Sequence, residues 1–230
     1  MQESQQVRDC LVAIPALNEA RYLQTLLQDI SAYFPVDHIL VVNDGSTDET
    51  GSIAQRAGVN IIDHSRNLGK GAAIRSALYF AKNKSFAWVL FLDGDGQHPV
   101  SFVPKFLQHI QAGHADLVLG NRHSRSQIMP LHRQLSNGIT SIMVSLSAGG
   151  QRIYDSQCGF RAIRLKTLHG ISLSENGFQL ESELLIKIIR TRARIQPVPI
   201  STQYRGEHSS IHLVGDTLKF IKLFISSLWW

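Results

Sequence analysis

Apolar runs and amphipathic segments alternate along the first half of the chain. The apolar runs have the length of buried strands, and the segments between them repeat apolar residues at helical spacing. The runs lie at residues 10–14, 38–42, 59–63, 86–92 and 115–119, and the helical segments at 19–31, 47–57, 69–82 and 100–112. Strands that are apolar on both faces and alternate with helices indicate a mostly parallel sheet with helices on both faces. We therefore predict an α/β fold.

The second half follows this pattern less regularly. It has helical segments at 131–148 and 178–191 and a short strand at 159–163. Residues 195–200 contain two prolines, which is typical of an edge strand. There is no internal repeat and no linker, so we predict one domain over residues 1–212, with the second half added to the sheet of the first.

Residues 213–230 form a separate amphipathic pattern. Val214, Leu218, Ile221, Ile225 and Leu228 recur at helical spacing, lysines flank them, and two tryptophans end the sequence. Tryptophan favours the membrane–water interface, and a basic amphipathic helix can lie on anionic lipid. A helix that packs on the domain is the other interpretation of this pattern.

Polar residues follow four of the predicted strands, at 15–19, 43–46, 64–70 and 93–98. Ligands of parallel α/β sheets bind beyond the carboxyl ends of the strands, so we expect these loops to converge on one crevice. In the last loop, Asp93, Asp95 and Gln97 present three oxygen ligands at alternate positions, and hard cations such as Mg²⁺ or Mn²⁺ take such ligands. The alternative is an ordinary turn, which also favours Asp and Gly.

Two other loops carry candidate binding residues. Asp44 follows a strand and precedes a helix, where an acidic residue can accept from a ribose or a base, although capping the helix is an alternative role. Residues 64–71 are not a Walker A motif, because His64 stands where the first Gly would be and Gly71 replaces Ser/Thr, but Lys70 stands at a helix N-terminus, where an anion can bind.

Composition narrows the class of protein. The chain has 230 residues, of which 43% are hydrophobic and 18% charged, as in a globular protein and unlike a disordered one. Two cysteines exclude a disulfide framework, and the sequence shows neither a signal peptide nor an apolar run that could span a bilayer. We therefore expect a cytoplasmic protein.

Basic residues are concentrated after the middle of the chain. Between Asp116 and Glu175 the only acidic residue is Asp155, against seven arginines and lysines. Such a stretch suggests an anionic group near the crevice. A solvated surface or contact with acidic phospholipid would also explain it. Aromatic interleaving and nucleic-acid motifs are absent, so we expect no nucleic-acid partner.

Several motifs occur together in one order: IPALNE, VVNDGSTDET, RNLGKGAA, FLDGDGQHP, LVLGNR, DSQCGFRA, FQLE and YRGEHSS. With them the chain resembles the family 2 glycosyltransferases of GT-A fold, in the branch of the polyprenol (dolichol) phosphate mannosyl- and glucosyltransferases. The resemblance implies a single GT-A domain, a UDP- or GDP-linked hexose donor, inversion at the anomeric carbon, and a polyprenyl phosphate or another lipid or glycan as acceptor.

The resemblance also implies roles for individual residues. The donor-binding positions are Pro15, Leu17, Glu19, Asp44, Lys70, Asp93 and Arg205, and the ligands of Mg²⁺ or Mn²⁺ are Asp93, Asp95 and Gln97. The positions that bind the acceptor phosphate are Arg122, Arg133 and Ser136. A peripheral position on the cytoplasmic face of a membrane would suit a lipid acceptor.

The need for a catalytic base depends on the acceptor. A phosphate oxygen is already anionic near neutral pH, whereas a hydroxyl needs a carboxylate base, for which Asp155 and Glu181 are the candidates. Two other classes of protein are alternatives. Phosphohydrolases of the haloacid dehalogenase type also carry a DxD motif at the end of a strand, and inactive proteins can bind a nucleotide sugar without transferring it. Gln97 stands where the former carry Thr, and the motif follows the fourth strand rather than the first.

Overall fold

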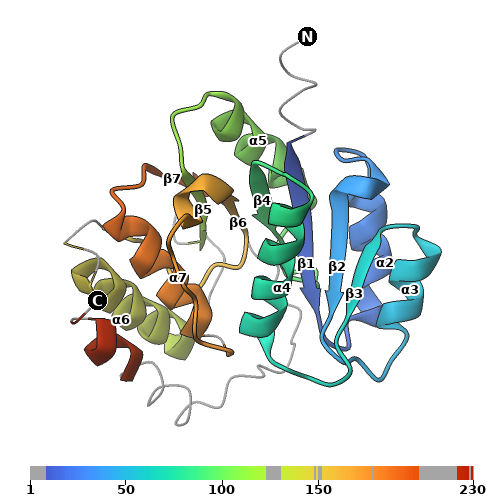
Figure 1. Ribbon diagram of the computed structural model, residues 1–230, viewed down its shortest axis with the longest axis horizontal. Coiled ribbons are helices and arrows are strands. Elements are labelled where there is room, and N and C mark those ends of the chain that lie inside the picture. The colour runs from blue at the N-terminus through green and yellow to red at the C-terminus, as the bar shows by residue number, and fades with distance from the viewer. Residues whose placement is uncertain are drawn as a thin grey trace.

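We describe the protein from a computed structural model that covers residues 9–122, 131–147, 149, 152–177, 179–201, 222–227 and 229, without the side chains of residues 131–136. Seven strands form one sheet in the order β3-β2-β1-β4-β6-β5-β7 (Figure 1). The strands are β1 (Cys10–Ala16), β2 (Ile39–Asn43), β3 (Asn60–Asp63), β4 (Trp88–Phe91), β5 (Leu117–Asn121), β6 (Arg161–Arg164) and β7 (Ile195–Pro199).

Parallel pairing dominates the sheet. The pairs β1–β2, β2–β3, β1–β4 and β5–β7 are parallel, whereas β6 runs antiparallel to both of its neighbours, β4 and β5. This confirms the predicted mostly parallel α/β sheet. It also confirms that the proline-containing strand β7 lies at an edge, where a residue without an N–H does not break the ladder.

Helices cover both faces of the sheet. Their bounds are α2 (Ala20–Ile30), α3 (Thr50–Arg56), α4 (Lys70–Asn83), α5 (Val103–Gln111), α6 (Leu131–Ser147) and α7 (Gln179–Arg190). Side chains alternate along β1, so that Cys10, Val12 and Ile14 pack in one core with α2, α3 and α5. Leu11 and Ala13 point to the other core, which α4, α6 and α7 complete.

A last short helix, residues 222–227, lies against the end of α6. Leu223 is 2% exposed and Ser227 is fully buried, and the hydroxyls of Ser227 and Ser147 are hydrogen-bonded at 3.0 Å. This part of the predicted 213–230 helix therefore packs on the domain, while residues 213–221 lie outside the described residues. Within the described part of the chain, no helix combines the length and apolarity needed to cross a membrane.

Candidate active site

The loops after the parallel strands meet at one end of the sheet, as predicted. The Asn18 amide donates to the Ser46 hydroxyl at 2.9 Å, which joins the loop after β1 to the loop after β2. The loop after β4 approaches the same place, since a Cβ added at Gly94 would lie 3.2 Å from Glu19 Cγ. The loops that carry these candidate donor residues therefore lie side by side.

Asp44 organises the loop that precedes α4. Its carboxylate accepts from the amides of Leu68 (3.0 Å) and Gly69 (2.8 Å), and it lies 2.6 Å from Nδ1 of His64. His64 in turn contacts the Ser76 hydroxyl through Nε2 at 2.9 Å. The Asp44 carboxylate thus accepts from two backbone amides at the start of α4 that could otherwise bind a phosphate. It also holds the loop that ends one residue before Lys70.

A second segment covers the start of α4. The Ala72 amide donates to the carbonyl of Asn176 at 3.3 Å, and the Arg75 guanidinium bonds to the Glu175 carbonyl and the Asn176 side chain. A Cβ at Gly71 would lie 2.6 Å from that same Asn176 carbonyl. Residues 175–177 therefore seal the helix N-terminus, and Lys70 is the basic group of this motif that reaches the crevice.

Lys70 joins two acidic residues from distant parts of the chain. Its Nζ lies 2.7 Å from Asp93 Oδ1 and 3.4 Å from Glu181 Oε1. Burial would raise the pKa of Asp93, but the charge and the hydrogen bond of Lys70 and the charges of its other basic neighbours together outweigh it and lower the pKa to about 2. Burial would lower the pKa of Lys70, but the charges of Asp93 and Glu181 outweigh it and raise the pKa. Asp93 and Lys70 therefore both carry their charge at neutral pH.

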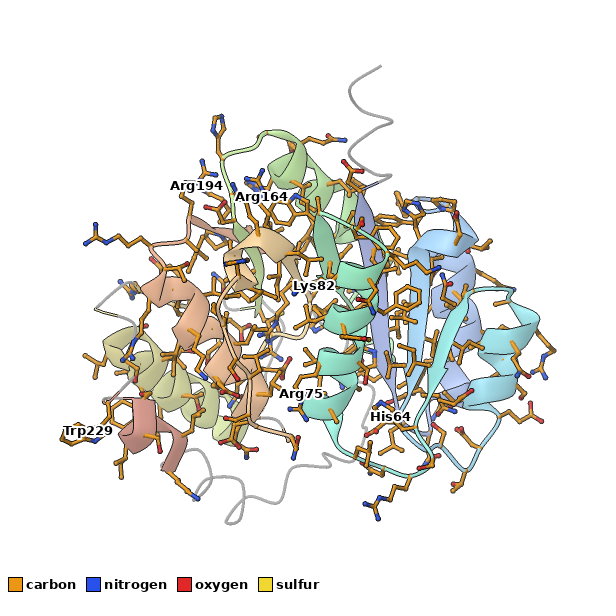
Figure 2. All side chains as sticks on the ribbon, viewed as in Figure 1. His64, Arg75, Lys82, Arg164, Arg194 and Trp229 are labelled. Atoms are coloured by element: carbon orange, nitrogen blue, oxygen red, sulfur yellow. The ribbon has the colours of Figure 1, made fainter. Side chains whose placement is uncertain are left out.

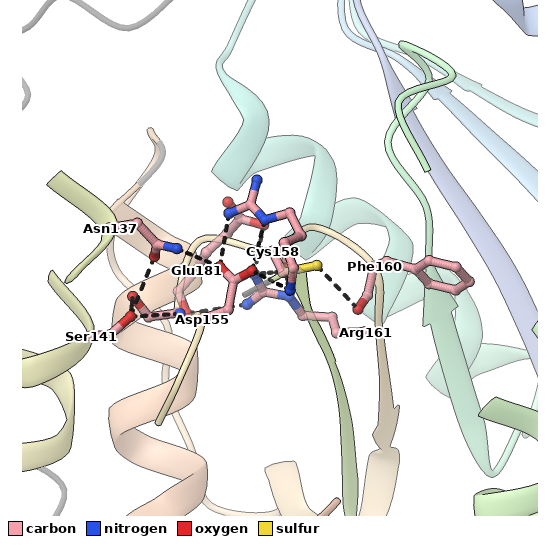
Figure 3. Close-up of polar contacts among 9 residues, drawn as sticks. Asn137, Ser141, Asp155, Cys158, Phe160, Arg161 and Glu181 are labelled. Atoms are coloured by element: carbon pink, nitrogen blue, oxygen red, sulfur yellow. Dashed lines mark hydrogen bonds and ion pairs between the residues drawn. The ribbon is translucent and has the colours of Figure 1, made fainter. Parts of the chain in front are cut away.

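Arg161 closes this network on the side of α7. Its guanidinium is 1% exposed, donates to Glu181 Oε1 at 3.0 Å, and donates to the Cys158 carbonyl (Figure 3). Glu181 therefore holds two cations, Arg161 and Lys70.

Asp155 pairs with Arg122, which lies 33 positions earlier. Arg122 donates from Nε (2.7 Å), from a terminal nitrogen (2.8 Å) and from its backbone amide (3.1 Å), and the Asn137 side chain donates a fourth bond at 2.8 Å. Burial would raise the pKa of Asp155, but the bonds from Arg122 outweigh it and hold the pKa below its ordinary value. One candidate acceptor residue and one candidate base are thus bound to each other.

Asp95 and Gln97 lie on the DGDGQ loop beside Asp93, and the Gln97 amide donates to Asp95 Oδ1 at 2.9 Å. Two carboxylates and one amide are hard oxygen donors, the type that Mg²⁺ and Mn²⁺ prefer. Among the described residues, no cluster of three His, Cys, Asp or Glu is placed so that it could hold a metal ion. The Lys70 ammonium already lies 2.7 Å from one oxygen of this donor set, Asp93 Oδ1.

Two residues of the site were missed in the sequence. Gly159 leaves room for Asp93, because an added Cβ would lie 2.5 Å from Asp93 Cγ. His98 is 5% exposed, and its Nδ1 has no hydrogen-bond partner among the described residues. The signal for His98 was its place directly after Gln97, and the signal for Gly159 was a glycine at the first position of the predicted strand 159–163.

His98 lies between the two ionic groups. The charges of Asp93 and Lys70 act on it, as do those of Arg122 and Asp155. Burial lowers its pKa to about 4, so the ring is neutral at pH 7.

The remaining predicted residues are placed as follows. Pro15 and Glu19 are half-buried at the end of β1 and the start of α2, and Leu17 between them is 36% exposed. Arg133 and Ser136 lie in the first turns of α6, where the side chains are outside the description, and Arg205 lies outside the described residues.

Residues 11–169 match the sequence model of the family described as Glycosyl transferase family 2. An uncharacterized protein of Methanocaldococcus jannaschii is 32% identical, over 93% of this chain and 99% of its own. The dolichyl-phosphate hexose transferase of Haloferax volcanii is 30% identical, over 88% of this chain and 86% of its own. Glucosyl-3-phosphoglycerate synthase from Mycobacterium tuberculosis, crystallised with Mn²⁺ and UDP-glucose, has the same fold, with a TM-score of 0.76 at 22% identity over 98% of this chain and 83% of that chain.

Proposed function

The chain belongs to glycosyl transferase family 2, and we propose that it transfers a hexose from a UDP- or GDP-sugar to a polyprenyl phosphate, with inversion at the anomeric carbon. The relatives support this acceptor class, since the Haloferax protein is named a dolichyl-phosphate hexose transferase. Because the fold neighbour was crystallised with UDP-glucose, a nucleotide-diphosphate donor is the natural choice.

The donor binds in the crevice formed by the loops after β1, β2 and β4. Pro15, Leu17 and Glu19 line the nucleoside side, and Asp44 holds the loop that carries Lys70. Arg205 belongs to the late segment that we assign to the diphosphate.

Asp93, Asp95 and Gln97 would hold Mg²⁺ or Mn²⁺, which, when bound, supplies positive charge against the departing diphosphate. Lys70 is the chain's own contribution to the same task, since its Nζ already lies 2.7 Å from Asp93. An ammonium at this position stabilises negative charge that develops as the bond between the sugar and the diphosphate breaks.

The observation that carries the acceptor assignment is that neither candidate base is available. Asp155 accepts four hydrogen bonds from Arg122 and Asn137, and Glu181 holds Arg161 and Lys70. A carboxylate held by arginine is a poor general base, because protonation would break its ion pair.

A phosphate acceptor avoids this difficulty. One of its anionic oxygens forms the new bond to the anomeric carbon, the diphosphate leaves with the electron pair of the old bond, and no proton has to be removed. Arg122, with Arg133 and Ser136 nearby on α6, would orient that phosphate, and Asp155 holds Arg122 in place. A hydroxyl acceptor on a lipid or glycan ranks second, since it would require Asp155 or Glu181 to leave its partners.

Such an enzyme would work at the cytoplasmic face of a membrane, where a lipid phosphate and a nucleotide sugar meet. The test is a panel of UDP- and GDP-sugars with Mn²⁺, with and without undecaprenyl or dolichyl phosphate, measured as release of UDP or GDP. We expect release to depend on the lipid phosphate and to be lost in Asp95→Ala. Release that responds to a hydroxyl acceptor and ignores the lipid phosphate would contradict the proposal.

A further inference from the structure

Helix α6 has its polar side inward and its apolar side outward. The buried residues of its described part follow helical spacing and are mostly polar: Asn137, Thr140, Ser141, Val144 and Ser147. On the opposite face, Ile139, Ile142 and Leu146 are 59%, 62% and 65% exposed. A helix on the surface of a globular domain normally shows the reverse arrangement. The outer face of α6 is therefore adapted to an apolar neighbour.

The short C-terminal helix extends this surface. Leu223 and Ser227 face the domain, while Ile225 is 54% exposed and Trp229 is 85% exposed, directed away from the body of the protein (Figure 2). The hydrogen bond between Ser227 and Ser147 joins this helix to the end of α6, next to Leu146. We call Ile139, Ile142, Leu146, Ile225 and Trp229 together the apolar face.

The charge around the apolar face is positive. Residues 117–230 contain 14 lysines and arginines against six aspartates and glutamates, and neither residues 131–147 nor residues 217–230 contain an acidic residue. Lys222 is exposed beside Ile225. Arg152 lies 4.8 Å over the ring of Tyr154, which is itself 46% exposed. An apolar surface on helices that carry basic but no acidic residues matches an anionic lipid bilayer, which offers hydrocarbon beneath negative headgroups.

A second copy of the chain fits the apolar face less well. A stable homodimer buries about 800 Å² on each partner, spread over roughly 20–30 residues. The apolar face offers five side chains on two helices, and two like-charged rims would repel each other. Tryptophan at the outermost position also favours the interfacial layer of a membrane.

We propose that the apolar face inserts into the headgroup layer of an anionic membrane and delivers the acceptor site to the lipid. This role in bringing the acceptor to the site rests on the proposed function. Helix α6 contacts the acceptor site directly, because Asn137 on its inner side donates to Asp155, which holds Arg122. With α6 lying on the membrane, the lipid phosphate would need to rise only across the width of one helix to reach these residues.

The experiment is sedimentation of the full chain with vesicles of phosphatidylcholine and phosphatidylglycerol in equal parts. We expect the wild type to bind, and Ile142→Glu and Trp229→Glu each to weaken binding by at least about tenfold, since a charge in this layer opposes insertion. Tyr79→Glu is the matched control, because Tyr79 is an apolar residue, 70% exposed, on α4 outside the apolar face. It should bind as the wild type does. Thermal unfolding of each variant verifies that it is folded.

A parallel assay separates this proposal from the proposed function. Transfer to a short, water-soluble prenyl phosphate without vesicles should be equal in the wild type, Ile142→Glu and Trp229→Glu. If the wild type transfers sugar in that assay but does not bind vesicles, or if Ile142→Glu binds as tightly as Tyr79→Glu, the membrane proposal is wrong. A wild-type dimer that Ile142→Glu converts to a monomer, without vesicle binding, would also overturn it. Vesicle binding by the wild type without any sugar transfer would instead contradict the proposed function and still support membrane binding by the apolar face.

Discussion

The Lys70 ammonium nitrogen lies 2.7 Å from Oδ1 of Asp93, so the first carboxylate of the DGDG motif already holds a cation that belongs to the chain. This ion pair joins the N-terminus of α4 to the end of β4, and Glu181 on α7 shares the same ammonium at 3.4 Å. Three segments far apart in the sequence are thus joined by one charge. A divalent ion that binds Asp93 would have to compete with this lysine.

Replacing Lys70 should therefore separate metal binding from donor binding. In Lys70→Met we expect Mn²⁺ alone to bind about tenfold more tightly, the equivalent of roughly 1.4 kcal/mol of lost competition. The affinity for the nucleotide sugar should fall, because its diphosphate loses a positive partner. Isothermal titration with Mn²⁺ alone, and then with donor at saturating Mn²⁺, measures both. Lys70→Arg, which keeps the charge, is the control; a Met variant with weaker Mn²⁺ binding would contradict the competition.

Gly159 should be intolerant of any side chain, although it touches no substrate in our proposal. In Gly159→Ala the new methyl group would overlap the Asp93 carboxylate, so that Asp93 must move. A displacement of about 1 Å at a reacting site can cost roughly 100-fold in rate. We expect a loss of this size in transfer, measured as UDP or GDP release, with little change in the unfolding temperature.

Gly138→Ala provides the comparison, since a Cβ at Gly138 in α6 meets nothing within 4 Å. It should be active and at least as stable as the wild type, because alanine favours a helix over glycine. Full activity in Gly159→Ala would mean that the position of Asp93 does not matter.

The alternation of apolar runs and helical segments predicted nearly every element, because the central strands β1, β2 and β4 are buried on both faces. The antiparallel direction of β6 was not predictable, since RAIR is four residues long and periodicity carries no direction. The converging loops followed from the parallel topology. The pairing of Arg122 with Asp155 and of Arg161 with Glu181 did not, because it joins residues 33 and 20 positions apart through the tertiary fold.

Asp155 should act by holding Arg122 and not as a base. Loss of a general base typically costs about 10²–10⁴ in kcat. We expect Asp155→Asn instead to raise the KM for the acceptor phosphate, with a smaller effect on kcat and none on the KM for the donor. The double variant Asp155→Asn, Arg122→Gln should lose less than the two single variants added together, because both remove one ion pair. Steady-state kinetics of the four proteins decides this, and additive losses would count against the shared role.

Asp116 should make the free energy of unfolding depend on pH in the acidic range. Arg194 donates hydrogen bonds to the Asp116 carboxylate, with Nε 2.9 Å from Oδ2, and these bonds lower the pKa of Asp116 to about 2. A lowered pKa adds stability above the ordinary pKa of an aspartate, and this contribution is lost as the pH falls towards 2. Because Arg194 is half exposed, solvent screens the pair and its contribution to stability is small. Urea unfolding should show Asp116→Asn less stable than the wild type at pH 7 and equally stable near pH 2; a difference that persists at low pH would point to another cause.

His98 should contribute to transfer at a cost in stability. Its buried Nδ1 lacks a partner among the described residues, and such an atom costs about 1–3 kcal/mol. His98→Leu removes the polar atom, so we expect the free energy of unfolding to rise by about 1 kcal/mol. Transfer should fall at least about tenfold, because a substrate polar group would lose the partner that the ring offers between Asp93 and Asp155.

His98→Asn tests the role of that nitrogen, since the asparagine amide reaches the position of Nδ1 without the rest of the ring. It should recover part of the transfer rate and lose the gain in stability. The split between kcat and the two KM values then shows which substrate the ring positions. If His98→Leu is more stable and transfers sugar as fast as the wild type, His98 has no part in the reaction and its unpartnered nitrogen is only a defect of packing.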